Sequence, residues 1–582
     1  MASDAFMPPL PCEARGRGHE DGFVLKPGSV FLSRTPIAGR KGAVACGHQE
    51  AAELGLDALR RGGNAIDAAI AGAFASFVVE PQMCGIGGHG RLSVYLADRG
   101  QAIGIDHFIR APKAATPEVY AAALTRWRNA GWGGTEGAIN TTGHLSVGIP
   151  GTVAGLWEAH RRFARLPWRS LVGPAIELAR AGIAADARLT LSIAGRTGEI
   201  RQHPEAAALL LPDNAPPRPA NAGGALHRFD FSDMAKTLEA IAEKGAAAFY
   251  DGPLAAAIDA EMRKAGGLLT AEDLAGYKPD TFQQPWYEYR GRGYVTCGDL
   301  IFAETLNILE RFDLGSLGQG SAESFHLIAE ALAQSFADSF AHAADPRHLK
   351  APLEGLASKA FAAVQAARIR TDRAQRTYAP GDPWPHQGPT PSVPPPPFEG
   401  TTQIAAADAD GNMASLITSL GSAFGSLVLI PGTGVFLGNA MQWFDPTPGR
   451  ANSVGPGRMP LYAAPVAIFR EGGRALGAIA GSGGYRIQPA VLFAAINRLD
   501  YGVDPQRAID LPRIHTEGEG LEVDTRIAAS VTERLKALGH CVRPVDGSGL
   551  PTAFGRPSAV WRAADGSLIP ASDARSGGVA AF

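Results

Sequence analysis

A threonine at position 401 stands where a self-activating nucleophile could arise. A proline-rich segment ends in Phe398-Glu399-Gly400 just before it, and the alternating residues 402–408 after it predict a β-strand. Because Gly400 has little steric bulk, the Thr401 hydroxyl is well placed to attack its own preceding carbonyl. Cleavage would leave Thr401 as a new amino terminus, and its α-amine, with a reference pKa of about 8, can take the proton from its own hydroxyl. The same local pattern also fits a threonine that merely starts a strand.

The overall composition predicts a globular protein large enough to hold such a residue in a buried site. The chain has 582 residues, of which 45% are hydrophobic and 19% charged, and these values exclude collagen-like, coiled-coil and wholly disordered classes. Fifty-four basic and 57 acidic residues give a formal charge of −3. Because nucleic-acid binders usually carry a basic face, no nucleic acid is expected as a partner.

Cysteine usage and the amino terminus predict the compartment. The five cysteines lie far apart, with no Cys-x-x-Cys pair, which argues against a disulfide framework or a zinc ribbon. The amino-terminal residues lack the apolar core of a secretion signal, and no run approaches about 18 uninterrupted apolar residues. The sequence therefore predicts a cytoplasmic protein with no membrane partner.

The pattern of elements changes at the proline-rich segment 379–400. Residues 1–35 are rich in proline, glycine and charge and are expected to form a flexible arm. Apolar residues at helical spacing then predict a mainly helical part, with helices at 48–61, 64–79, 151–164, 170–181, 234–244, 253–265, 302–312, 321–343 and 356–371. After the proline-rich segment, strands are predicted at 402–408, 413–419, 464–469 and 475–481, and helices at 485–499 and 530–538. The layout suggests strands stacked under helices.

A glycine-rich segment at 84–90, CGIGGHG, formally matches the G-x-G-x-x-G fingerprint of dinucleotide loops. Such a loop lies after a strand and before a helix, whereas here a predicted helix precedes the segment and an alternating run follows it. We therefore expect a close-packed loop. No His-Glu-x-x-His motif or clustered acidic set predicts a catalytic metal, so neither a metal nor another cofactor is expected.

Short motifs in a fixed order over roughly 42–580 carry a resemblance to a known family. They are Gly63-Asn64-Ala65-Ile66-Asp67-Ala68-Ala69, Glu80-Pro81-Gln82 with Gly85-Ile86-Gly87-Gly88, Gly148-Ile149-Pro150-Gly151-Thr152-Val153-Ala154-Gly155-Leu156, Asp273-Leu274-Ala275-Gly276-Tyr277, Thr401-Thr402, Asp410-Gly411-Asn412, Phe424-Gly425-Ser426, Gly483-Gly484, Asp500-Tyr501-Gly502 and Ser572-Asp573-Ala574-Arg575. By their order and spacing, the chain resembles the γ-glutamyltranspeptidase family of amino-terminal-nucleophile hydrolases.

The resemblance implies a fold and a maturation step. The fold would be of the α/β class, a four-layer αββα sandwich, made as one precursor that cuts itself at the Gly400–Thr401 bond. The large subunit would be 36–400 and the small subunit 401–582, and the two would remain associated, with further homo-oligomerisation left open. Thr401 would then be the nucleophile and the amino-terminal base.

The resemblance also implies roles for three further residues. Ser419 occupies a position where the family has a threonine whose hydroxyl orients the nucleophile, and either hydroxyl can do so. Gly483 and Gly484 match the pair whose backbone amides hold the oxyanion, where the lack of a Cβ leaves the tetrahedral intermediate room to approach.

In an ungapped match to the family, the residues that bind the α-carboxylate of a glutamyl donor are replaced in this chain. The family has an arginine where Phe108 stands, and paired serines where Tyr462 and Ala463 stand. A two-residue gap would instead bring Arg110 to the pocket, where its guanidinium could pair with a carboxylate. A surface arginine is the alternative reading of Arg110.

The family's grip on the α-amino group is also absent. An Asn, a Gln and an Asp of the family are matched here by Gly421, Ala440 and Trp443. Because an apolar pocket cannot offset the desolvation of a zwitterionic amino acid, we expect a different acyl group.

Together these features predict a threonine amidohydrolase or acyltransferase that cleaves a small-molecule amide through an acyl-enzyme at Thr401, with water as the acceptor. Two alternatives stay open. One is a γ-glutamyltransferase or glutathione hydrolase with an unusual donor pocket, and the other is a catalytically silent family member that serves as a binding or structural protein.

Overall fold

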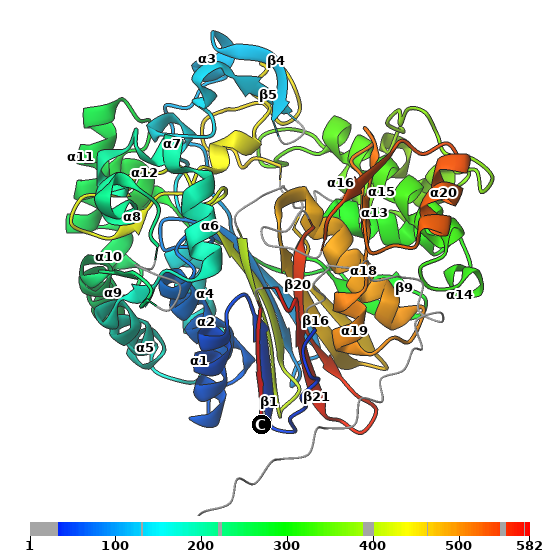
Figure 1. Ribbon diagram of the computed structural model, residues 1–582, viewed down its shortest axis with the longest axis horizontal. Coiled ribbons are helices and arrows are strands. Elements are labelled where there is room, and N and C mark those ends of the chain that lie inside the picture. The colour runs from blue at the N-terminus through cyan, green and yellow to red at the C-terminus, as the bar shows by residue number, and fades with distance from the viewer. Residues whose placement is uncertain are drawn as a thin grey trace, which may run out of the picture.

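The computed structural model describes residues 33–129, 132–218, 224–387, 401–461, 464–547, 554–575 and 577–582. Most of the predicted amino-terminal arm, Gly400 and Tyr462 lie outside the described residues. The described part of the chain forms two β-sheets that pack face to face between two layers of helices (Figure 1).

The first sheet has seven strands, and the strand that begins at Thr401 is an inner strand, third from one edge. Its order is β22 (Gly578–Ala581), β1 (Gly42–Cys46), β11 (Thr401–Asp408), β12 (Met413–Ser419), β2 (His89–Leu96), β3 (Gln101–His107) and β8 (Asp280–Gln283). All neighbours are antiparallel, and every residue of β11 is buried. Because β11 is flanked by β1, the parts of the chain before and after position 401 share one sheet.

The second sheet has six strands and supplies the glycine pair. Its order is β21 (Leu568–Ser572), β20 (Arg556–Arg562), β16 (Arg474–Ser482), β15 (Ala467–Glu471), β10 (Arg292–Val295) and β9 (Tyr287–Tyr289). Small side chains such as Ala405, Ala407 and Ala478 fill the space between the sheets. Their size lets the two sheets approach closely, and β11 packs directly against β16.

Two helical layers cover the outer faces. The layer over the seven-stranded sheet contains α1 (Gln49–Arg60), α2 (Ala65–Val79), α4 (Thr152–Phe163), α5 (Trp168–Ala181) and α9 (Ser232–Lys244), and the layer over the six-stranded sheet contains α13 (Leu300–Leu309), α15 (Ala322–His342), α18 (Ile487–Leu499) and α19 (Pro505–Asp510) (Figure 1). All residues of α2 are buried, as its apolar sequence predicts. Asn64 and Asp67 form a capping box that fixes its start.

Shorter elements complete the described chain. They are α3 (Glu118–Ala121), β4 (Leu124–Asn129), β5 (Trp132–Thr135), β6 (Ile183–Ala184), α6 (Ala187–Gly195), α7 (Thr197–Ile200), α8 (Pro204–Leu210), β7 (Arg228–Phe229), α10 (Ala247–Tyr250), α11 (Pro253–Ala265), α12 (Ala271–Gly276), α14 (Leu314–Leu317), α16 (Leu353–Leu356), α17 (Lys359–Ala366), β13 (Leu429–Ile430), β14 (Val435–Phe436), β17 (Ile514–His515), β18 (Leu521–Asp524), α20 (Ala529–Ala537) and β19 (Val542–Val545). In the described ranges, no helix is both long and apolar enough to cross a bilayer.

The expected four-layer αββα arrangement is confirmed, and one predicted helix needs correction. The part before the proline-rich segment is mainly helical with sheet strands, as expected: β1, β2, β3 and β8 join one sheet, and β9 and β10 join the other. The helix predicted at 356–371 is the shorter α17, and Leu356 instead ends α16. The Ser358 side chain accepts a hydrogen bond from the Phe361 amide at 3.0 Å and so starts a new helix there.

Candidate active site

Thr401 and Ser419 face each other at the ends of two paired strands. They are register partners in the β11–β12 ladder, and both side chains are buried. The Thr401 hydroxyl donates to Ser419 Oγ at 3.2 Å, and Ser419 Oγ also accepts from the Gly421 amide at 2.9 Å. The serine is thus held by the backbone of the next loop while it contacts the threonine, as an orienting residue must be.

The alternation of β11 determines which way the Thr401 side chain points. Ala405 and Ala407 belong to the core between the two sheets, whereas Ile404 and Ala406 belong to the core under the helices. Gln403 reaches Ser558 on the second sheet, with Nε2 to Oγ at 2.9 Å. Because side chains on a strand alternate with a period of two, Thr401 faces the second sheet.

Thr402 anchors the same strand from the opposite face. Its hydroxyl donates to the buried carboxylate of Glu80, at the end of α2. Arg188 Nη1 donates to Glu80 Oε1 at 3.1 Å and to the Gly47 carbonyl at 3.3 Å. A Cβ on Gly47 would lie 2.3 Å from Thr402 Oγ1, so only glycine fits there. Glu80 belongs to one of the sequence motifs, but the sequence alone did not predict its contact with Thr402.

Gly483 and Gly484 form the turn that follows β16. Their φ angles of +126° and +68° lie in the region that favours glycine. A Cβ on Gly483 would lie 2.8 Å from the Cα of Gly555, a contact that real Cβ atoms do not make. A short 3₁₀ turn, η6 (Gly484–Arg486), and then α18 begin here, so the turn's amides lie at a helix start, where intrahelical partners are lacking.

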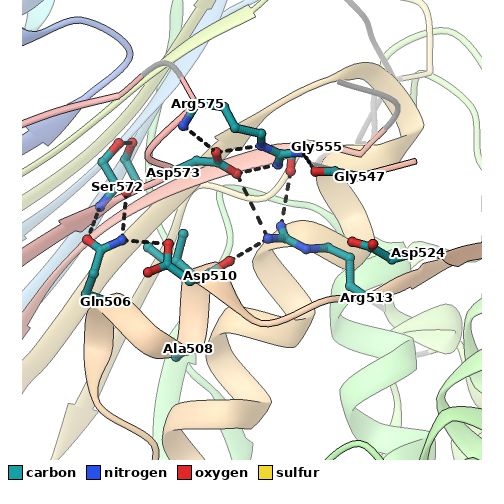
Figure 2. Close-up of polar contacts among 12 residues, drawn as sticks. Gln506, Ala508, Asp510, Arg513, Asp524, Gly547, Gly555, Ser572, Asp573 and Arg575 are labelled. Carbon is teal, nitrogen blue, oxygen red and sulfur yellow. Dashed lines mark hydrogen bonds and ion pairs between the residues drawn. The ribbon is translucent and has the colours of Figure 1, made fainter. Parts of the chain in front are cut away.

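A buried polar network holds Gly555 against this turn (Figure 2). Arg513 Nη1 donates to the Gly555 carbonyl at 3.1 Å, and Arg513 Nη2 lies 4.0 Å from Asp573 Oδ2. Arg575 Nε donates to Asp573 Oδ1 at 2.7 Å. Burial lowers the pKa of Arg513 to about 10, and the Arg575 guanidinium holds the pKa of the Asp573 carboxyl well below its usual range despite burial. The Ser572-Asp573-Ala574-Arg575 motif therefore helps to hold Gly555 in place against the glycine turn.

A cavity of about 950 Å³ lies beside these strand ends. Its lining includes Ser422, which follows β12, Gln442 and Trp443, which follow β14, and Tyr485, which follows β16. Charged side chains of both signs also line it: Arg196, Glu199, Arg486, Glu522 and Arg543. The cavity therefore combines aromatic rings with charges, and Arg486 is the residue next to Tyr485.

The predicted acyl-pocket residues are not all placed alike. Phe108, Ala440 and Trp443 all belong to one buried core cluster, and of these three residues Trp443 also lines the cavity. The Phe108 ring packs edge-on against His89, with centroids 4.3 Å apart, and His89 is the register partner of Ser419. Phe108 therefore packs in the core beside His89 of β2, and it is not among the residues that line the cavity.

Arg110 is occupied by a protein carboxylate. Its Nη2 lies 2.6 Å from Asp280 Oδ2, and its Nη1 donates to the carbonyls of Phe108 and Ile109 at 3.2 Å. Its side chain is 9% exposed, so it is also not the surface arginine of the alternative reading. A role for Arg110 in gripping a substrate carboxylate would require the pair with Asp280 to open.

Two side-chain carboxamides lie next to Gly421, one of the positions matched to the family's contacts with the donor α-amino group. Gly421 has a φ of +97°, and a Cβ there would lie 2.0 Å from Asn439 Oδ1. Asn439 Oδ1 accepts from the Ser422 amide and from Gln442 Nε2, both at 2.9 Å. Sequence reasoning matched Ala440 and Trp443 and so missed Asn439 and Gln442, one residue before each.

The fold and these contacts agree with comparisons to known proteins. Residues 51–582 match the family model described as gamma-glutamyltranspeptidase. The chain belongs to this family. It is 36% identical to the acylase ACY 1 proenzyme of Pseudomonas sp. (strain SE83) over 564 residues, covering 94% of this chain and 96% of that protein. It is 33% identical to the glutathione hydrolase proenzyme of Pseudomonas sp. (strain A14) over 503 residues, covering 83% of each.

A solved structure supports the same family assignment. The crystal structure of cephalosporin acylase from Bacillus halodurans superposes with a TM-score of 0.84 at 28% identity, covering 96% of this chain and 99% of that one. This member of the gamma-glutamyltranspeptidase family is therefore an amide hydrolase of the amino-terminal-nucleophile class, in which enzymes are made as autoprocessed precursors. The reading as a catalytically silent binding protein is not retained.

Proposed function

We propose that the protein is a threonine amidohydrolase that cleaves a small amide through an acyl-enzyme at Thr401. The observation that supports this most directly is the buried Thr401–Ser419 hydroxyl pair, 3.2 Å apart, at the start of β11. Its side-chain direction, toward the sheet that carries the glycine turn, follows from the alternation of β11.

The chemistry would use groups of this chain alone. Thr401 Oγ attacks the amide carbonyl carbon while its proton passes to the Thr401 α-amine. The amides of Gly483 and Gly484 donate hydrogen bonds to the carbonyl oxygen and stabilise the negative charge that develops on it. When the C–N bond breaks, the amine product takes the proton, and water then hydrolyses the threonine ester and restores the hydroxyl.

Maturation by cleavage between Gly400 and Thr401 would free the α-amine that this scheme needs. The products would be residues 1–400, which hold the amino-terminal arm and the proposed large subunit 36–400, and the small subunit, 401–582. Their association does not require new contacts, because β11 and β22 of the second part flank β1 of the first in one sheet. The proenzyme names of the relatives support such a step.

The acyl group would be one without the α-amino and α-carboxylate groups of glutamate. Trp443 and Tyr485 line the cavity with their rings 6.3 Å apart, and Arg110 is already paired with Asp280. A neutral or flat acyl group suits the aromatic part, and the charged wall suits a polar amine portion. The names of the acylase relatives, one of them a cephalosporin acylase, agree with this substrate class.

A second candidate is glutathione hydrolysis or γ-glutamyl transfer. The specific observation in its favour is the carboxamide pair Asn439 and Gln442 beside Gly421. Asn439 Oδ1 accepts from the Ser422 amide and from Gln442 Nε2, and the Gln442 amide oxygen can accept a hydrogen bond from a substrate ammonium group. The glutathione hydrolase proenzyme among the relatives agrees with it.

Turnover of matched amides separates the two candidates. Purified enzyme and the Thr401→Ala variant are assayed with a γ-glutamyl anilide and with anilides of neutral acyl groups. We expect hydrolysis of a neutral anilide that Thr401→Ala abolishes. Hydrolysis of the γ-glutamyl anilide alone would favour the second candidate, and activity that survives in Thr401→Ala would rule out the proposed nucleophile.

A further inference from the structure

Two histidines and a glutamate converge in the outer helical layer over the six-stranded sheet. His326 and Glu330 lie one turn apart on α15, and His540 follows α20. One ligand atom from each of the three lies within 4.8 Å of the other two, and His326 Nδ1 is 2.8 Å from His540 Nε2. Glu330 and His326 are buried, while His540 is partly exposed.

The surroundings of His326 and Glu330 resemble those of metal ligands. His326 Nε2 lies 2.7 Å from the Arg370 carbonyl, which accepts its proton and leaves Nδ1 as the nitrogen whose lone pair faces His540 Nε2. Metal-binding histidines are typically oriented by such a contact on the far ring nitrogen. Glu330 is oriented in turn by Tyr378 and Gln375. Its Oε1 accepts from the Tyr378 hydroxyl at 2.6 Å, its Oε2 accepts from Gln375 Nε2 at 3.2 Å, and the two oxygens share the Gln375 amide at 3.3 Å.

We propose that His326, Glu330 and His540 bind a first-row transition-metal dication of the zinc type. Two imidazoles and one carboxylate are a ligand set that zinc accepts, with a fourth position for water on the exposed side of His540. Zn–N bonds of about 2.0–2.1 Å in a tetrahedron place two nitrogens about 3.3 Å apart. The 2.8 Å separation of His326 Nδ1 and His540 Nε2 therefore has to open by only a fraction of an ångström.

The position of the group indicates a structural role. His326 and Glu330 precede Thr401 in the chain, and His540 follows it. Under the proposed cleavage, the ion would join the large and small subunits in the helical layer, where α15 packs against α20 (Figure 1). The site takes no part in the reaction at Thr401, so it can be tested whether or not the proposed function holds.

Zinc binding to the purified full protein tests the proposal. After treatment with a chelator and its removal, wild type is titrated with Zn²⁺ by calorimetry, and bound metal is measured by elemental analysis. We expect about one zinc per molecule and a melting temperature that rises with zinc concentration. His540→Gln and Glu330→Gln, which keep polar groups in place, should lose the zinc and the rise.

His342→Gln is the matched control, because His342 lies on the same helix and has a single backbone partner, the Gly381 carbonyl at 2.8 Å. It should bind zinc as wild type does. Co²⁺ in place of zinc should give the visible absorption of a tetrahedral site in wild type and not in His540→Gln. Wild type that binds no more zinc than His540→Gln, or a thermal shift equal in both, would overturn the proposal.

Discussion

The hydroxyl of Thr401 lies 3.2 Å from that of Ser419, whereas the hydroxyl of the next residue, Thr402, contacts Glu80 on the opposite face of the sheet. The first two residues of β11 are thus fixed from both sides. Because a nucleophile needs a defined position relative to the scissile carbonyl, this double anchoring is what a reactive first residue requires. It also explains why two consecutive threonines stand at this strand start.

Thr401→Ala should remain uncleaved and inactive. Dividing 60.7 kDa in the ratio of 400 to 182 residues gives expected fragments of about 42 and about 19 kDa for wild type on a denaturing gel. The variant should give one band because it lacks the attacking hydroxyl. Amino-terminal sequencing of the smaller fragment should begin at Thr401. Active wild type without such a fragment would contradict both the processing and the nucleophile.

Ser419→Ala should lower kcat by about tenfold, because it removes a hydrogen bond whose net worth is about 0.5–1.5 kcal/mol. Ser419→Thr keeps a hydroxyl and serves as the control, with activity close to wild type. Steady-state kinetics on cleaved protein measures both. Equal kcat for wild type and Ser419→Ala would show that the 3.2 Å contact does not orient the nucleophile.

Thr402→Val should destabilise the protein, because it leaves the buried Glu80 carboxylate with one partner fewer. A hydrogen bond to a charged group contributes about 1.5–3 kcal/mol, so in a chain of this length the melting temperature should fall by about 1–3 °C. Thr402→Ser keeps the hydroxyl and should melt close to wild type. A Thr402→Val protein as stable as wild type would mean that Arg188 alone holds Glu80.

Gly483→Ala should lower kcat by about a hundred- to a thousandfold, the usual effect of losing one oxyanion donor. The added Cβ would press on Gly555 and displace the turn. Gly502→Ala is the control, since Gly502 also has a positive φ, of +65°, but its Cβ would meet open space. Near-normal turnover in folded Gly483→Ala would remove the glycine turn from the active site.

The sequence predicted the central elements well because their patterns are strong. The apolar run of α2 and the alternating runs of β11 and β12 appear within a residue or two of the expected bounds. Strands β8, β9 and β10 were missed, because they are only three or four residues long and carry little pattern. Short edge and linking strands depend on their partners, which a single sequence does not reveal.

The sequence predicted the site residues that belong to motifs and missed those that only the fold brings together. The Thr401–Ser419 contact agrees with the roles that the family resemblance implied. Asn439 and Gln442 were overlooked because ungapped matching considered the residue after each. The pair His326 and His540 could not be found either, since 214 positions separate two residues that the fold brings into contact.

The preference for one acyl group over another depends on how Trp443 and Arg110 are placed. Trp443 is in the cavity wall, whereas the Arg110 guanidinium is 2.6 Å from Asp280 and surrounded by backbone carbonyls. A substrate ammonium and carboxylate would each lose hydration without a charged partner in the aromatic part. We therefore expect kcat/KM for a neutral acyl amide to exceed that for the γ-glutamyl amide by about ten-thousandfold.

Two variants distinguish the origin of that preference. Arg110→Ala should leave the ratio of the two kcat/KM values unchanged, although the loss of the Asp280 pair should lower the melting temperature. Trp443→Ala should reduce kcat/KM for the neutral amide by about ten- to a hundredfold, since burial against a large apolar side chain contributes about 1.5–3 kcal/mol and part of the Trp443 surface lines the cavity. Efficient γ-glutamyl turnover that disappears in Arg110→Ala would instead show that the Asp280 pair opens to admit a substrate carboxylate. That result would make the family's usual donor the substrate here, with Arg110 as its anchor.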